Sequence, residues 1–247
     1  MNNICIIIPI YNHAVTVGTV IEGALSYGLK VFVVDDGSTD YLQEVLQRFD
    51  GKISVISYSK NKGKGYALQR GFGVARKEGY YYALTLDADG QHRCEDIPLL
   101  LNAIEQHPHS LIIGSRKLNQ ENMPSKNTFA NRFSNFWFTV QTGKRLPDTQ
   151  TGFRIYPLCR MKKIKLFTSR YEAELELLVR LAWKGINIVP VKINVFYPPQ
   201  NERVTHFRPG FDFFRISLLN TVLTIMAFFY GYPRMLIQKL KNLREKV

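Results

Sequence analysis

The first half of the chain alternates short apolar runs with stretches in which apolar residues recur at helical spacing. The apolar runs are rich in β-branched and aromatic residues, which predicts strands at residues 4–8, 31–35, 53–58, 81–87 and 110–114. The stretches between them predict helices at residues 14–27, 39–49, 64–78 and 95–106. Such an alternation is typical of an α/β fold with a mostly parallel sheet covered by helices.

The second half of the chain has a different pattern. Residues 118–150 are less regular, residues 170–185 carry a strong amphipathic helical period, and residues 186–197 favour a strand. Residues 211–232 are apolar and aromatic, and a basic amphipathic tail follows them. We therefore expect a main domain over residues 1–209 and a helical appendage over residues 210–247.

Composition adds a strong positive charge to this picture. The 247 residues include 33 Lys and Arg against 20 Asp and Glu, a formal net charge of +13. This excess favours an anionic partner such as a nucleotide, a lipid phosphate or a membrane surface. No nucleic-acid-binding motif is visible, so nucleic acid is not expected as a partner.

Cysteine usage and the N-terminal residues bear on the compartment. The chain has three widely spaced cysteines, which predict neither a disulfide framework nor a zinc site and fit a reducing compartment. The apolar run Ile4–Ile8 lacks a basic leader and stops at Pro9, so it reads as a strand, not a signal peptide.

A polar cluster follows each of the five strands predicted in the first half. In order these clusters are YNH, DDGSTD, NKGKG, DADGQH and GSRK. Ligands of parallel α/β sheets bind beyond the carboxyl ends of the strands. The recurrence predicts a single site built from these loops.

Two carboxylates in the fourth cluster suit a divalent cation. Asp87 and Asp89 are separated by one residue at the end of a strand, so both side chains can reach one hard ion. Oxygen ligands of this kind suit Mg²⁺ or Mn²⁺, which also bind a substrate diphosphate. A solvated acidic turn is the alternative interpretation.

The second and third clusters suit a nucleotide. Asp35 and Asp36 can accept hydrogen bonds from a base or ribose, although the same segment also reads as a helix start capped by Ser38 or Thr39. Lys64 lies among glycines before a helix, which is typical of phosphate binding and equally of an ordinary basic turn.

Taken together, the motifs resemble glycosyltransferase family 2. The matching pieces are IPIYNH, VVDDGSTD, NKGKGYAL, LDADGQH, IIGSR and DTQTGFRIYP, in family order over roughly residues 4–157. They look most like the polyprenyl-phosphate branch, which includes dolichyl-phosphate mannose synthases and glucosyltransferases. The resemblance implies a nucleotide-sugar-binding fold of the GT-A type, inversion at the anomeric carbon, and Mg²⁺ or Mn²⁺ as cofactor.

The resemblance also assigns candidate residues. It implies a metal motif of Asp87, Asp89 and Gln91, with Asp89 also taken as catalytic. It implies that Arg116 and Arg132 bind the acceptor phosphate, with an ordinary surface charge as the alternative for Arg132, and that a loop with His206 and Arg208 closes over donor or acceptor. The candidate donor-binding residues are Pro9, Tyr11, Asn12, Asp35, Asp36, Lys64 and Asp87.

The chemistry of the acceptor leaves two alternatives open. A lipid phosphate is already a nucleophile and needs arginines to orient it, whose planar forks suit phosphate. A lipid or glycan hydroxyl needs a general base, for which Glu174 and Asp148 are the candidates. Glu174 also fits the acidic first turn of a helix, where the helix dipole favours it.

Three functional hypotheses follow. The first is transfer of a hexose, glucose or mannose, from a UDP- or GDP-sugar to a polyprenyl phosphate. The second is transfer by the same fold to a lipid or glycan hydroxyl. The third is a non-catalytic module that binds anionic surfaces, which predicts no metal-dependent binding of a nucleotide sugar.

The apolar stretch 211–232 is an imperfect membrane span. Asp212 and Arg215 interrupt its start, and Asn220 and Thr224 lie within it, whereas a free span needs about 20 predominantly apolar residues. With the basic tail, the stretch suits an interfacial anchor, peripheral or monotopic, on the cytoplasmic face of a membrane. Helices packed on the main domain are the alternative.

Overall fold

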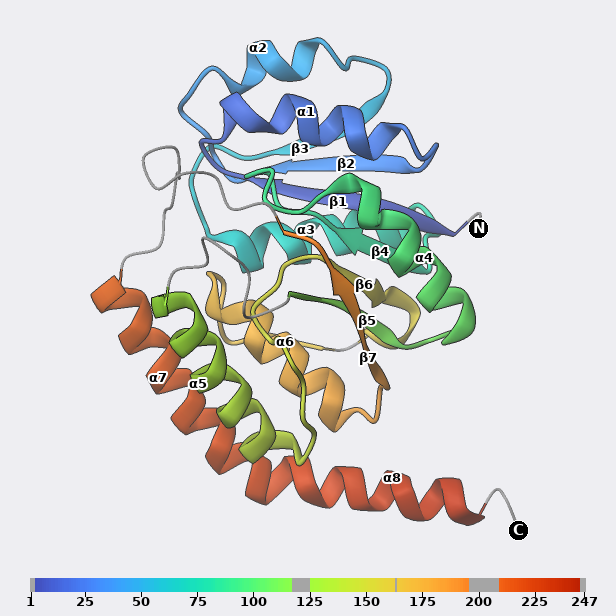
Figure 1. Ribbon diagram of the computed structural model, residues 1–247, viewed down its shortest axis with the longest axis vertical. Helices are drawn as coiled ribbons and strands as arrows, with labels where there is room; N and C mark the ends of the chain where they lie inside the picture. The colour runs from blue at the N-terminus through green and yellow to red at the C-terminus, as the bar shows by residue number, and fades with distance from the viewer. Residues whose placement is uncertain (1–2, 117–124, 163, 196–208, 245–247) are drawn as a thin grey trace.

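The computed structural model describes residues 3–116, 125–162, 164–195 and 209–244. A mixed seven-stranded sheet in the order β3-β2-β1-β4-β6-β5-β7 forms its centre (Figure 1). Strand β6 is antiparallel to β4 and β5, and the other pairs are parallel. The predicted mostly parallel mixed sheet is confirmed. The strands are β1 (Ile4–Ile10), β2 (Lys30–Asp35), β3 (Ile53–Ser57), β4 (Tyr82–Thr85), β5 (Leu111–Arg116), β6 (Arg154–Pro157) and β7 (Ile188–Ile193).

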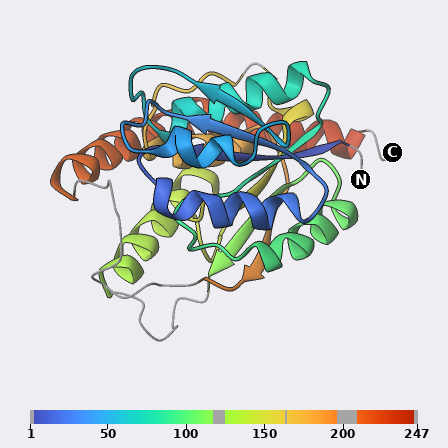
Figure 2. The same ribbon diagram turned by 90° about the horizontal axis from the view of Figure 1, so that it is seen from above.

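Helices cover both faces of the sheet (Figures 1 and 2). The side chains of β1 alternate between the two resulting cores, with Ile6 and Ile8 in one and Cys5 and Ile7 in the other. Burial on both faces explains why β1 reads as a continuous apolar run. The first core contains α1 (Ala14–Leu25), α2 (Leu42–Gln47) and α4 (Ile97–Gln106), and the second contains α3 (Lys64–Lys77), α5 (Ser125–Thr142), α6 (Glu172–Trp183) and α7 (Pro209–Met226).

Short helical turns complete the described elements. Two 3₁₀ turns, η1 (Cys94–Asp96) and η2 (Leu158–Arg160), precede α4 and follow β6. A π-helical turn, η4 (Ala227–Gly231), joins α7 to the final helix α8 (Tyr232–Arg244).

Strand β6 is the one central strand that the sequence pattern did not predict. It has four residues, too few to show a period, and it begins with the fully buried Arg154. The Arg154 guanidinium donates to the backbone carbonyls of Thr149, Thr151 and Glu174 at 2.7–3.2 Å. These bonds join the segment before β6 to the start of α6. A contact between segments so far apart in the sequence cannot be predicted from a local pattern.

The polar residues that interrupt the apolar stretch 211–232 face the protein. Arg215 of α7 pairs with the buried Glu172 of α6. Gln141 of α5 donates to Asn220 Oδ1 at 3.1 Å. Leu219 and Leu223 lie in the same apolar core as α6, so the predicted boundary after residue 209 falls at the start of a helix that shares the core of the main domain.

The side of α7, η4 and α8 that faces away from the rest of the protein is apolar and exposed. Phe214, Leu218, Phe229, Ile237 and Leu240 are each 51–84% exposed. The helix bends at the π turn, close to Pro233, and α8 leaves at an angle to α7 (Figure 1). By length and composition, the helical segment Asp212–Lys241 could cross a membrane. Of its apolar 18-residue stretch, 22% is buried within the protein.

Candidate active site

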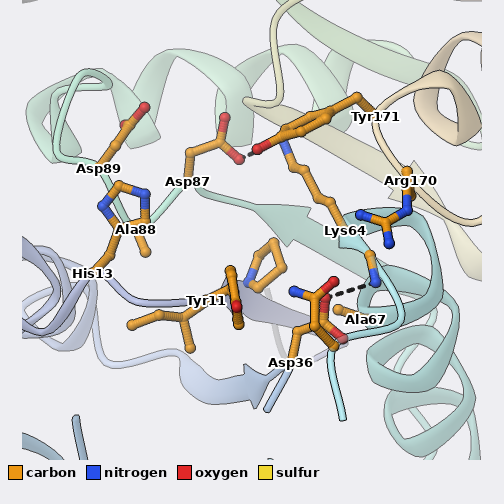
Figure 3. A pocket seen from close by; sticks show the side chains of 14 residues that line it. Tyr11, His13, Asp36, Lys64, Ala67, Asp87, Ala88, Asp89, Arg170 and Tyr171 are labelled. Atoms are coloured by element: carbon orange, nitrogen blue, oxygen red, sulfur yellow. Dashed lines mark hydrogen bonds and ion pairs between the residues drawn. The ribbon is translucent and has the colours of Figure 1, made fainter. Parts of the chain in front are cut away.

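A cavity of about 600 Å³ opens at the carboxyl ends of β1, β2, β3 and β4 (Figure 3). Four of the five predicted polar clusters contribute to its wall, and β1, α3 and the segment before α6 supply the remaining residues. The described residues of the fifth cluster, Gly114–Arg116, do not line it. The lining residues are Pro9, Ile10, Tyr11, His13, Asp36, Asn61, Gly63, Lys64, Ala67, Asp87, Ala88, Asp89, Arg170 and Tyr171.

Pro9 is tolerated in a central strand because of where it lies. Strand β4 ends at Thr85, which pairs with Ile7, so β1 at Pro9 has its strand partner on the β2 side only. Proline lacks an N–H and is accepted where a ladder hydrogen bond is not required. The early end of β4 leaves room for the cavity beside Pro9.

A lysine and two carboxylates form the charged centre of the cavity. Lys64 Nζ lies 2.7 Å from Asp87 Oδ1 and 2.8 Å from Glu174 Oε2. The three side chains are 19%, 21% and 10% exposed, so this ion-pair network is largely shielded from water. Asp87 and Lys64 come from different predicted clusters, and α6 supplies the third member.

A glycine of the DTQTGFR motif makes room for this network. A Cβ at Gly152 would lie 2.5 Å from Asp87 Oδ2 and 2.8 Å from Lys64 Nζ. Only glycine lets the backbone approach so closely. The motif therefore contributes space to the site, in addition to any side chain.

The network separates the pKa values of the two carboxylates in the DADGQH loop. Burial opposes ionisation of Asp87, but the Lys64 ammonium outweighs it and lowers the pKa of Asp87. Burial and then the charge of Asp87 raise the pKa of Asp89. Burial would lower the pKa of Lys64, but its two carboxylate partners raise that pKa well above its usual range. Asp87 is thus held as the anion, and Asp89 is the more easily protonated of the two.

Several predicted donor-binding residues fix the loops around the cavity. Asp36, which lines the cavity, accepts hydrogen bonds from the backbone N–H groups of Lys62 and Gly63, both at 2.7 Å. Asp35 accepts from the Ser38 N–H at 2.8 Å, and Asn12 accepts from the Thr39 N–H at 2.8 Å. Asp35 and Asn12 therefore shape the first two loops from outside the cavity wall.

The loop that carries Asp89 is held at both ends. Thr16 donates to the Ala88 carbonyl at 2.6 Å, and Asp89 Oδ1 accepts from the Gln91 N–H at 3.0 Å. Gln91 is half-buried and lies outside the cavity wall.

The donor set fits a hard divalent cation that is shared with a substrate. Within the described ranges, no group of three or more His, Cys, Asp or Glu side chains converges on one point. Asp87 and Asp89 instead present two carboxylates to an open cavity. Mg²⁺ commonly binds through one or two carboxylates and completes its shell with water and substrate phosphates.

Arg116 and Asp148 form a second ion pair, in which the carboxylate is fully buried. Arg116 donates from Nε to Asp148 Oδ2 at 2.6 Å and from Nη2 to Oδ1 at 3.0 Å, and Asn131 Nδ2 donates to Oδ1 at 2.6 Å. Burial would raise the pKa of Asp148, but its hydrogen bonds with Arg116 lower it. Asp148 therefore orients Arg116 at the end of β5. Arg132, the other predicted phosphate ligand, is exposed on α5.

The three glutamates that begin α6 have different partners. Glu172 pairs with Arg215. Glu176 accepts from the Phe167 and Thr168 N–H groups at 2.9–3.0 Å and pairs with Arg180. Only Glu174 reaches the charged centre through Lys64.

Four polar or aromatic residues of the cavity wall were given no role from the sequence, although two of them, His13 and Asn61, belong to the predicted polar clusters. His13, Asn61, Arg170 and Tyr171 all line the cavity (Figure 3). Arg170 and Tyr171 precede α6, and no local pattern reports that this segment packs against the start of α3. The predicted closing-loop residues His206 and Arg208 lie outside the described residues.

Solved structures share the fold. Glucosyl-3-phosphoglycerate synthase from Mycobacterium tuberculosis, crystallised with Mn²⁺, UDP-glucose and phosphoglyceric acid, has a TM-score of 0.66 at 16% identity, covering 92% of this chain and 79% of that one. Mannosyl-3-phosphoglycerate synthase from Rubrobacter xylanophilus has a TM-score of 0.63 at 20% identity, covering 97% and 75%. The predicted GT-A-type fold is confirmed by this likeness.

Sequence relatives extend over most of the chain. A UDP-N-acetylglucosamine–dolichyl-phosphate N-acetylglucosaminyltransferase from Methanococcus voltae is 28% identical, covering 87% of this chain and 95% of that protein. Human dolichyl-phosphate β-glucosyltransferase is 30% identical, covering 76% and 66%. The family model described as glycosyl transferase family 2 matches residues 5–166. The chain therefore belongs to glycosyltransferase family 2.

Proposed function

We propose that the chain is a metal-dependent, inverting hexosyltransferase that moves glucose or mannose from a UDP- or GDP-sugar to a polyprenyl phosphate. The observation that carries the proposal is the division of charge between two sites. Asp87 and Asp89 face the cavity, whereas Arg116 is held by Asp148 outside its wall. An acidic centre suits a cation, which in turn binds a diphosphate. An oriented guanidinium suits an anionic acceptor.

The donor half of the proposal uses the cavity. Asp87 and Asp89 would hold Mg²⁺ or Mn²⁺, with Gln91 beside them in the same loop. The cation would supply charge neutralisation for the departing nucleoside diphosphate. The family fold with bound Mn²⁺ and UDP-glucose in the mycobacterial synthase supports this donor class.

The acceptor half uses Arg116 and needs no general base. A phosphate oxygen attacks the anomeric carbon, and the bond from that carbon to the donor diphosphate breaks with its electron pair on the leaving group. A phosphate monoester has its second pKa near ~6, so it reacts at neutral pH without losing a proton. Asp148 is already committed to Arg116 and Asn131, which favours this acceptor over a hydroxyl.

Named relatives support the same acceptor class. They include the dolichyl-phosphate transferases above and a dodecaprenyl-phosphate galacturonate synthase from Rhizobium johnstonii, which is 28% identical over 65% of this chain and 49% of that protein.

A lipid or glycan hydroxyl is the second candidate acceptor, and one observation favours it. Glu174 Oε1 is buried and has no hydrogen-bond partner among the described residues. A carboxylate oxygen in that position suits a general base. The opposing observation is the 2.8 Å ion pair of Glu174 Oε2 with Lys64.

The helical appendage suits the surface of a membrane. The inner side of α7 is packed on α5 and α6, so α7 is not a free span. Its outer side exposes aromatic residues, and α8 exposes Leu236 and Leu240 beside Lys239 and Lys241. An apolar face flanked by lysines favours the interface of an anionic leaflet, here the cytoplasmic face.

A donor and acceptor screen tests the proposal. The full chain is incubated with UDP- and GDP-hexoses, Mn²⁺ and short polyprenyl phosphates, and products are identified by mass spectrometry. We expect a hexosyl phosphoprenol. Products formed on hydroxyl acceptors alone would favour the second candidate. The absence of Mn²⁺-dependent binding of UDP- or GDP-sugars in calorimetry would favour a non-catalytic module.

A further inference from the structure

The Lys64 ammonium pairs with Asp87, one of the two carboxylates that the proposed function assigns to the metal. The ammonium contacts Asp87 in the cavity (Figure 3) and also pairs with Glu174 of α6. Close packing of two backbone segments places Lys64 for this bridge. A Cβ at Gly65 would lie 2.1 Å from Ala173 Cβ, so the start of α3 is pressed against the start of α6. Lys64 is therefore positioned to reach both carboxylates at once.

The bridge and a metal at Asp87 compete for the same charge. A second cation beside Asp87 is repelled by the Lys64 ammonium, and the repulsion is strong because the network is mostly shielded from water. The two cations are accommodated together when the ammonium leaves Asp87. Glu174 also pairs with Lys64, so the ammonium keeps a partner after that move.

We infer that Lys64 is a built-in counter-cation for Asp87, and that binding of a divalent cation displaces it toward Glu174 and the donor diphosphate. The inference rests on the proposed donor site and extends it to an exchange of partners. Glu174 is then the carboxylate that keeps its ion pair with Lys64 after the lysine has left Asp87. In the protein without metal, Lys64 neutralises Asp87. In the loaded protein, it is available to the donor's phosphate oxygens.

The exchange predicts an unusual sign for one substitution. If the bridge only stabilises the fold, replacing Lys64 leaves the affinity for metal unchanged or lowers it. If Lys64 is a competing cation, its removal raises that affinity. The same removal takes away a diphosphate ligand, so Mn²⁺ and UDP should then enhance each other's binding less than in the wild type.

Calorimetric titration with MnCl₂, without nucleotide, tests the sign. From the loss of one unit charge in contact with the site, we expect Lys64→Met to bind Mn²⁺ roughly ten- to a hundred-fold more tightly than the wild type. The control Lys77→Met removes the same charge at the exposed far end of the same helix and should leave the affinity unchanged. A repeat with UDP present should show less mutual enhancement in Lys64→Met.

Unchanged or weaker Mn²⁺ binding in folded Lys64→Met overturns the inference. If wild type binds Mn²⁺ and only this gain is missing, the proposed metal site survives. If neither protein binds Mn²⁺, both ideas are overturned. Because Lys64→Met takes the ammonium away from two largely shielded carboxylates, the double variant Lys64→Met with Glu174→Gln is titrated as well. It removes one charge of each sign and should still bind Mn²⁺ more tightly than the wild type.

Discussion

The loops around the cavity direct charged and polar side chains toward a ligand, whereas the helices α5, α6 and α7 direct theirs toward one another. Around the cavity, Asp87, Asp89 and Lys64 face the space where a ligand fits. In the helical region, Arg215 and Asn220 face neighbouring helices, and the outer side is left apolar. Residues that look like interruptions of an apolar stretch are therefore the contacts that attach it to the protein.

The ion pairs of Lys64 with Asp87 and of Arg116 with Asp148 show the same contrast on a smaller scale. Lys64 with Asp87 lies in the cavity wall and leaves Asp87 exposed enough to exchange partners. Arg116 with Asp148 joins through two parallel hydrogen bonds, and Asp148 is fully buried. A single-point lysine contact suits exchange, whereas a bidentate arginine fork suits fixed orientation.

The largest expected effect comes from the acidic centre. Loss of Asp89 removes one of two proposed metal ligands, and several kcal/mol of charge stabilisation corresponds to a loss of about a thousand-fold or more in kcat/KM. Asp89→Ala is compared with wild type in a Mn²⁺-dependent transfer assay. Asp50→Ala, an exposed carboxylate outside the cavity, is the matched control. Near-wild-type activity of Asp89→Ala would refute the assigned role.

Arg116 separates the acceptor from the donor. Arg116→Lys keeps the charge but loses the fork that Asp148 holds, so transfer to polyprenyl phosphate should fall about ten- to a hundred-fold through one to three kcal/mol of lost contact. Calorimetric binding of UDP with Mn²⁺ should be unchanged. A hydroxyl acceptor predicts the reverse pattern: Glu174→Gln would abolish transfer, and Arg116→Lys would be tolerated.

The outer face of the appendage should control attachment to lipid. Phe229 is 84% exposed, and inserting its ring into a membrane is worth about 1.5–3 kcal/mol. Phe229→Glu should weaken co-flotation with vesicles that contain anionic lipid about ten-fold or more. Leu99→Glu introduces the same charge at an exposed apolar site on α4 and should have no effect. Equal loss in both variants would argue against docking through this face.

The difference between the two regions also explains what could be predicted from sequence. The five strands of the first half and the carboxylates at their ends follow local rules, because each parallel strand is a buried apolar run that ends at the ligand edge. Strand β6 and the cavity residues Arg170 and Tyr171 depend on contacts between segments distant in sequence. Arg215 and Asn220 of α7 were read as breaks in a span because their partners, Glu172 and Gln141, belong to other helices.

The smallest expected effect concerns Arg170, a cavity residue that local pattern did not reveal. Figure 3 places it with Lys64, away from Asp89 and His13. A guanidinium at the wall should contribute one charge-assisted contact to the donor phosphates, so Arg170→Ala should weaken UDP binding about ten-fold. Arg76→Ala removes an exposed arginine near the opposite end of α3 and serves as the control. Because Arg170 is not part of the Lys64 bridge, its loss should leave Mn²⁺ binding without nucleotide unchanged, whereas loss of Lys64 should tighten it. If both variants changed Mn²⁺ affinity alike, the effect would be one of general positive charge in the cavity and not of a lysine that competes for Asp87.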